Sequence, residues 1–149
     1  MNQKPSKMHV YGKSAALTIE ACENSKNDFF TVMFEIAPSD NGTADWTKKI
    51  AVQPTSQELP SILAVFLGYA VTARIKRDQK GLEVTAQGDR VFFKGGYQKP
   101  YALPIVAGDR VGCCALLLQE YSRNYPDLQP ALIIASLQSI RTPSPRASG

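Results

Sequence analysis

The chain has 149 residues, of which 44% are hydrophobic, 20% charged and 9% aromatic, and this composition excludes a disordered or fibrous protein. Lys and Arg outnumber Asp and Glu by 17 to 13, so the formal net charge of +4 is compatible with a polyanionic partner. We expect one domain over residues 1–141, large enough to bury roughly two-thirds of its unfolded surface without disulfides or metal. The tail, residues 142–149, is rich in Pro, Ser and Arg and is predicted to be disordered.

The cysteines and the hydropathy pattern indicate a cytoplasmic protein without cofactor or metal. Cys22, Cys113 and Cys114 form an odd set without metal-ligand spacing, which favours a reducing compartment. The first residues contain no continuous apolar segment, and the longest apolar run, residues 62–67, is far too short to span a bilayer.

In the first half of the chain, apolar and polar residues alternate along three segments. Residues 15–21 and 30–36 flank a turn-like Asn-Ser-Lys-Asn and are predicted to pair as antiparallel strands. Alternation over residues 46–53 predicts a third strand. Thr55 and Glu58 then have the spacing of a capping box, which predicts a helix over about 56–69 that ends at Gly68.

The second half repeats this order of elements. Strands are expected over 71–76, 82–86 and 90–94, with a further short strand over 101–105, and the short turns between them indicate a meander.

Helical periodicity returns near residue 108 and ends at the Asn-Tyr-Pro of residues 124–126. Residues 127–141 fit either a helix or a last strand, and we favour the helix. The predicted fold class is therefore α+β, with two antiparallel sheet-plus-helix halves in which one helix covers one face of each sheet.

The titratable residues do not favour an enzyme. His9 is the only histidine and is expected to be an exposed strand residue, and no Ser or Cys lies in a recognisable nucleophile motif. Cys113 and Cys114 lie in an apolar helical pattern, where a free cysteine packs as a small hydrophobe.

The basic residues gather in one stretch, residues 71–101, which carries seven basic and three acidic side chains and therefore the whole net charge. Aromatic residues are interleaved with them, a combination that suits single-stranded nucleic acid because cations follow the backbone and exposed rings stack on unpaired bases. Phe92 and Phe93 point to opposite sides of their strand, so we expect one of them in the core. A merely solvated basic face is the alternative for the cluster, as is a core-edge position for Trp46. The candidate binding residues are Trp46, Lys48, Lys49, Arg74, Lys76, Arg77, Arg90, Phe92, Lys94, Tyr97, Lys99 and Tyr101.

Several segments resemble a known family. Residues 46–52 (WTKKIAV) followed by 55–68 (TSQELPSILAVFLG) look like the strand-to-helix unit of prokaryotic relatives of the Whirly and positive-cofactor-four single-stranded-DNA-binding proteins. Residues 80–84 and 90–93 resemble strands of that family's second half, and residues 108–118 resemble its second helix. The resemblance covers about residues 8–125. It implies two sheet-plus-helix halves, assembly into dimers or tetramers, and a basic, aromatic-bearing sheet surface for single-stranded nucleic acid.

An argument from packing also favours a homo-oligomer. An open meander leaves edge strands, and both predicted helices are apolar enough to bury more surface than one sheet layer covers. We therefore expect a non-enzymatic, sequence-tolerant single-stranded-DNA-binding protein. Single-stranded RNA binding is a variant of this hypothesis, and a structural or regulatory oligomer whose sheet face binds a protein partner is the alternative.

Overall fold

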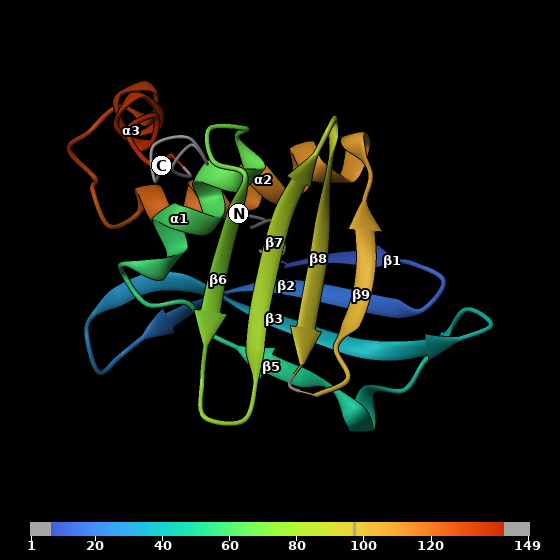
Figure 1. Ribbon diagram of the computed structural model, residues 1–149. Coiled ribbons are helices and arrows are strands. Elements are labelled where there is room, and N and C mark those ends of the chain that lie inside the picture. Colours follow the sequence, from blue (N-terminus) through green and yellow to red (C-terminus); the bar gives the residue numbers. More distant parts are fainter. Residues whose placement is uncertain (1–6, 97, 142–149) are drawn as a thin grey trace, which may run out of the picture.

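The computed structural model describes residues 7–96 and 98–141, and these fold into two antiparallel sheets with three α-helices (Figure 1). The first half contains β1 (Lys7–Tyr11), β2 (Ala15–Asn24), β3 (Phe29–Asp40), β4 (Thr43–Ala44), the 3-10 helix η1 (Trp46–Lys48), β5 (Ile50–Val52) and α1 (Glu58–Phe66). The second half contains β6 (Thr72–Lys76), β7 (Gly81–Gln87), β8 (Arg90–Gly96), β9 (Tyr101–Ile105), α2 (Ala107–Ser122) and α3 (Pro130–Leu137). The predicted α+β class and the helical interpretation of residues 127–141 are confirmed.

Each sheet is an antiparallel arrangement of neighbouring strands. The first sheet has the order β1-β2-β3 with β4 and β5 both paired to β3, and the second is the meander β6-β7-β8-β9. In the first sheet, Leu17 lies opposite Ile36 and Ile19 opposite Phe34, so the alternating apolar residues of both strands share one face. Residues 142–149, for which disorder was predicted, lie outside the described residues.

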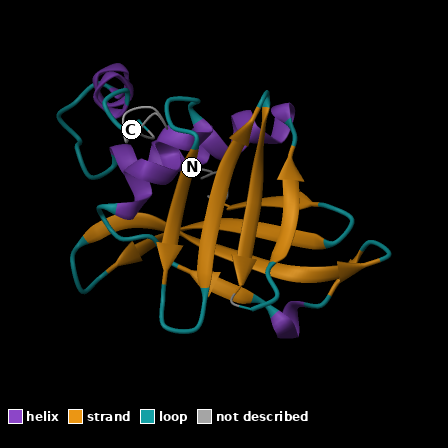
Figure 2. Cartoon of the chain, viewed as in Figure 1, coloured by secondary structure: helices purple, strands orange, loops and turns teal. Residues whose placement is uncertain are grey.

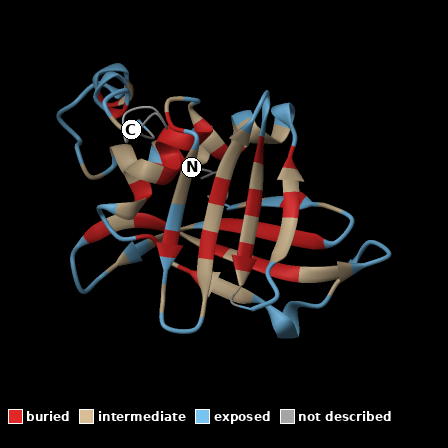
Figure 3. Ribbon diagram, viewed as in Figure 1, coloured by how far each residue is buried: buried red, intermediate tan, exposed pale blue. Residues whose placement is uncertain are grey.

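The two sheets pack face to face, and their strands cross at a steep angle (Figures 1 and 2). The rings of Phe34 and Phe93, one from each sheet, are 5.3 Å apart at the centre of this interface. The first sheet packs closely against Gly95, where an added Cβ would lie 2.6 Å from the Ile36 Cγ2 atom. Figure 3 shows buried residues along the strands of both sheets and on the helices.

The expected layering, with one helix covering one sheet in each half, is wrong. α1, from the first half, lies against β6 and β7 of the second sheet, whereas α2, from the second half, lies against β1, β2 and β3 as well as β8. The two helices also contact each other. Alternation shows that a strand has one apolar face, but it does not show what covers that face. Here the other sheet and a helix from the other half both contribute.

The predicted third strand over residues 46–53 is also wrong in its first part. The Asp45 carboxylate accepts hydrogen bonds from the Thr47 amide at 3.2 Å and from the Thr47 hydroxyl, which closes the turn of η1. Only Ile50–Val52 forms a strand, so Trp46 does not share a strand face with those residues.

The ends of α1 follow the sequence signals closely. The Thr55 hydroxyl accepts from the Glu58 amide at 3.2 Å, while the Glu58 carboxylate accepts from the Thr55 amide at 3.0 Å, which is the reciprocal pattern of a capping box. Gly68 follows the helix with φ +89°, a left-handed conformation that favours glycine. No helix within the described residues is both long and apolar enough to cross a membrane.

Candidate nucleic-acid interface

The side of the second sheet that points away from the first sheet carries four of the predicted binding residues, Arg74, Lys76, Phe92 and Lys94, and we call it the outer face. Strand register arranges its side chains in three rows that run across the strands. The upper row, Thr72-Thr85-Phe92-Pro104, is mainly uncharged; the middle row is Arg74-Glu83-Lys94-Ala102, and the lower row is Lys76-Gly81-Gly96. Figure 1 shows this face toward the viewer, with the helices beside and behind the upper ends of the strands.

The middle row is an ionic network centred on Glu83. The Arg74 Nε atom donates to one Glu83 oxygen at 2.5 Å, and the Lys94 Nζ atom lies 3.4 Å from the other. The hydrogen bond from Arg74 is the largest of the influences that lower the pKa of Glu83, and Lys94 acts in the same direction. The row therefore holds two cations around one carboxylate and carries a net positive charge.

A shallow hollow of about 130 Å³ lies beside this network. Its lining includes Gly81, Gly95 and Gly96, which carry no side chain, and cationic side chains border it. The further lining residues are Arg74, Ile75, Lys76, Leu82, Glu83, Lys94 and Pro100.

Phe92 and Phe93 divide as expected between the two sides of β8. Phe93 is fully buried against Phe34, whereas Phe92 is half-buried on the outer face, two positions from Lys94. Phe92 lies opposite Thr85 on β7 and Pro104 on β9. The upper row thus offers an apolar platform directly above the ionic row.

Other predicted cations lie away from these rows. The Arg77 guanidinium donates to both Glu58 oxygens, at 2.7 and 2.9 Å, and to the Gln53 carbonyl at 3.0 Å, so it ties the end of β6 to the start of α1. Arg90 is exposed at the turn between β7 and β8, and Lys99 is exposed in the loop before β9. Tyr97 lies outside the described residues.

A second group of predicted residues surrounds η1. The Tyr101 hydroxyl donates to the Lys48 carbonyl at 3.2 Å, which places η1 beside the start of β9. Trp46 is 36% exposed and Lys48 lies 4.0 Å from Asp45. Lys49 pairs with Glu35 at 3.0 Å, on the side of the first sheet that points away from the sandwich. The structure therefore brings together Arg74, Lys76, Phe92 and Lys94 on one face. It places Trp46, Lys48 and Tyr101 around η1. The Lys49 and Arg77 side chains instead pair with Glu35 and Glu58.

Sequence reasoning missed Glu83 and the glycine lining of the hollow. Glu83 alternates with Leu82 and Val84 along β7, so its position on the outer face could have been inferred from the sequence. Its partners could not, because they depend on the register between β6, β7 and β8. No cluster of potential metal ligands occurs within residues 7–96 and 98–141.

Two apolar hollows lie away from the outer face. One, of about 410 Å³, follows α2 and the end of α1 and is lined by Phe66, Leu67, Arg110, Val111, Cys114, Ala115 and Leu118. Its α2 residues recur at helical spacing and form what we call the α2 stripe: Val111, Cys114, Ala115 and Leu118. Val111 is 70% exposed, an unusual degree for a large apolar side chain in a row of others.

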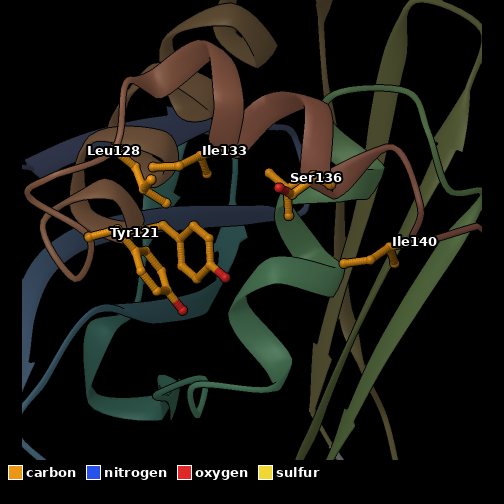
Figure 4. A pocket seen from close by; sticks show the side chains of 7 residues that line it. Tyr121, Leu128, Ile133, Ser136 and Ile140 are labelled. Carbon is orange, nitrogen blue, oxygen red and sulfur yellow. The ribbon is translucent and has the colours of Figure 1, made fainter.

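The other hollow, of about 290 Å³, lies between the end of α2 and α3 (Figure 4). Tyr121, Leu128 and Ile133 surround one part of it and Ile140 lies at its far end. The ring of Tyr121 meets that of Tyr125 edge to face at 5.4 Å, and burial raises the pKa of Tyr121. Cys113 is buried in the core nearby on α2, where burial raises its pKa to about 12, in agreement with a packing role.

Comparison with solved structures supports a Whirly fold. The plant transcriptional regulator PBF-2 superimposes with a TM-score of 0.62 at 16% identity, over 82% of this chain and 83% of that one. WHY1 from Arabidopsis thaliana gives 0.63 at 16% identity, over 82% and 86% of the two chains. The MRP1/MRP2 proteins of Trypanosoma brucei give 0.62 at 12% identity, over 82% and 87%. At these identities the likeness establishes the fold alone, and the prokaryotic and positive-cofactor-four parts of the resemblance stay predictions. No family model and no curated protein sequence matches the chain.

Proposed function

We propose that this protein binds single-stranded DNA through the outer face of the second sheet, without strong sequence preference and without catalysis. The observation that carries the proposal is the juxtaposition of a stacking surface and cations on one sheet face: Phe92 lies two positions before Lys94 on the same side of β8, and Lys94 shares its row with Arg74. An unpaired base stacked on such a ring is worth about 1–3 kcal/mol, and neighbouring cations would neutralise the phosphates on either side of it.

The second group, at η1, extends the same path. Trp46 and Lys48 lie beside the start of β9, and the exposed Lys99 precedes that strand. A strand of nucleic acid that crosses the outer face would reach these side chains next. Arg77 is engaged by Glu58, so we assign it a structural role rather than a phosphate contact.

We also propose that the protein acts as a homodimer or homotetramer. The α2 stripe is an exposed apolar row next to the end of α1, and burial against a second copy would remove it from water. A cytoplasmic location is part of the proposal and is supported by the cysteine pattern, which favours a reducing compartment.

The test is fluorescence anisotropy with a labelled oligonucleotide of about 12 nucleotides, a length within the usual site sizes. The unmodified protein should bind single strands in preference to duplex, and the affinity should fall steeply between about 50 and 200 mM salt. The double charge reversal Arg74→Glu with Lys76→Glu should weaken binding by at least about tenfold and reduce the salt slope. Lys26→Glu, in the exposed turn between β2 and β3, is the matched control and should change little.

Competition with single-stranded RNA of the same sequence decides between the two nucleic acids, because the ribose 2′-hydroxyl is the only group that differs along the backbone. Equal binding to duplex, or binding that ignores salt and the charge reversal, would contradict the proposal. In that case the protein-partner alternative would gain support.

A further inference from the structure

The glycine-lined hollow of the outer face carries an acceptor that a purely electrostatic surface would not need. Glu83 lines the hollow together with Arg74, Lys76 and Lys94, and it is the one carboxylate among the described residues that line it. An anion in the middle of a phosphate-binding surface lowers the local positive charge and so weakens backbone binding. The Glu83 carboxylate on this face therefore suggests a role other than attracting phosphate.

The carboxylate is held in place and retains acceptor capacity. Arg74 binds one of its oxygens and Lys94 lies near the other, and each carboxylate oxygen has two lone pairs, so one remains free on each atom. The side chain is 25% exposed, so these lone pairs are within reach of a ligand in the hollow. Glu83 therefore presents a fixed, charged acceptor at the edge of a flat surface.

The dimensions of the face fit a base. The hollow of about 130 Å³ has Gly81, Gly95 and Gly96 in its lining, and it accommodates one planar group rather than a whole nucleotide. Phe92 on β8 lies diagonally across from Glu83 on β7, which corresponds to a separation of roughly 7–8 Å. Two successive bases of one DNA strand can therefore bind side by side, one in the hollow and the next stacked on the Phe92 ring. Lys76 is exposed and also lines the hollow, so its ammonium group is available to the adjacent phosphate.

We infer that the hollow binds an unpaired base and that Glu83 accepts a hydrogen bond from its exocyclic amino group. This inference rests on the proposed function and refines it: cytosine and adenine carry such an amino group, and thymine does not. A carboxylate that accepts from the cytosine N4 amino group is an established form of base recognition. The protein therefore binds many sequences but favours cytosine over thymine at one position of each bound segment.

The test compares oligo(dC) with oligo(dT) of about 12 nucleotides by anisotropy at constant salt. Oligo(dC) should bind about fivefold to tenfold more tightly, which corresponds to one good contact to a base edge. Glu83→Gln should reduce this preference to less than about twofold, because the amide is a weaker acceptor and its NH₂ group can donate to thymine O4. The same variant should bind both oligonucleotides more tightly than the unmodified protein, since an anion has been removed from the face.

Glu35→Gln is the matched control. Glu35 lies on the outward side of the first sheet, pairs with Lys49 and is 27% exposed, so it resembles Glu83 in burial and ion pairing but lies on the other sheet. This variant should keep the preference for oligo(dC). Thermal unfolding of both variants checks that they are folded, and Glu83→Ala provides a second substitution that should also remove the preference.

The outcomes separate the inference from the proposed function. Two results would overturn the inference but not the proposed function. The first is strong, salt-dependent binding with equal affinity for the two oligonucleotides. The second is a preference for oligo(dC) that Glu83→Gln and Glu83→Ala leave unchanged. Absence of single-strand binding altogether would overturn both.

Discussion

Among single residues, Glu58 and Arg77 form a bidentate ion pair that joins α1 to the end of β6. Two hydrogen bonds join the guanidinium to the carboxylate, and the same carboxylate caps α1 through the Thr55 amide. Arg77 is the main cause that lowers the pKa of Glu58 below its ordinary value of 4.5. Because folding lowers this pKa, the stabilisation is fully present above pH 4.5 and is lost as the pH falls through the lower folded-state value.

The corresponding prediction concerns Glu58→Gln, which keeps the size of the side chain but removes its charge. We expect a loss of about 1 kcal/mol in the free energy of unfolding at neutral pH, since the pair is partly exposed. The difference between variant and unmodified protein should shrink as the pH is lowered from 4.5 through the lower folded-state pKa, below which both carry an uncharged group. Urea denaturation at neutral pH and at pH values below 4.5 measures it, with Glu23→Gln on β2, which has no ion pair with the described residues, as the control. A difference that stays constant with pH would refute this account.

The binding residues show why single positions were only partly predictable. Alternation placed Arg74 and Lys76 on the outward side of β6, as the structure has them, because this inference needs only the period of a strand. Arg77 could not be separated from them, since its partner Glu58 is nineteen positions away and belongs to a helix. The predicted strand position of Trp46 was wrong for a local reason. The hydrogen bonds that Asp45 accepts stabilise the turn of η1, and the alternating pattern of the following residues does not reveal them.

At the level of elements, boundaries with a chemical signal were predictable and contacts between elements were not. The capping box and Gly68 define α1, and each predicted strand of the second half lies within two residues of its position in the structure. The sequence does not predict that α1 packs on the second sheet and α2 mainly on the first, because an apolar stripe on a helix can pack against any apolar surface.

The prediction at this level concerns the α2 stripe. If it is the contact between copies, Val111→Asp combined with Ala115→Asp should convert the oligomer into a monomer, because buried carboxylates without partners are costly. Multi-angle light scattering measures the mass, and Leu132→Asp on α3, also an exposed apolar position, is the control. An unmodified protein of 16.3 kDa at micromolar concentration would contradict the assembly itself. An oligomer that survives the double change would place the contact elsewhere.

For the whole molecule, the shared core predicts that both sheets unfold together. Phe34 and Phe93 contact each other across the interface, so neither sheet retains its buried face once the other is lost. Fluorescence of Trp46 and far-ultraviolet circular dichroism should give coincident urea transitions. Gly95→Val should shift both transitions equally, by about 1–3 kcal/mol, because its side chain would collide with Ile36. Separate transitions for the two probes would mean that the halves are independent.

The exchange of helices between the two halves also has a consequence for synthesis on the ribosome. The first sheet leaves the exit tunnel with its apolar face complete, but the strands and the helix that cover this face, up to Ser122 at the end of α2, are made later. Translation proceeds at roughly 5–20 residues per second. The apolar face that contains Leu17, Ile19 and Phe34 is therefore exposed to water for seconds before the covering segments are made. The nascent chain is therefore most exposed to chaperones and to aggregation during this interval, and slowing translation within the second half would prolong it.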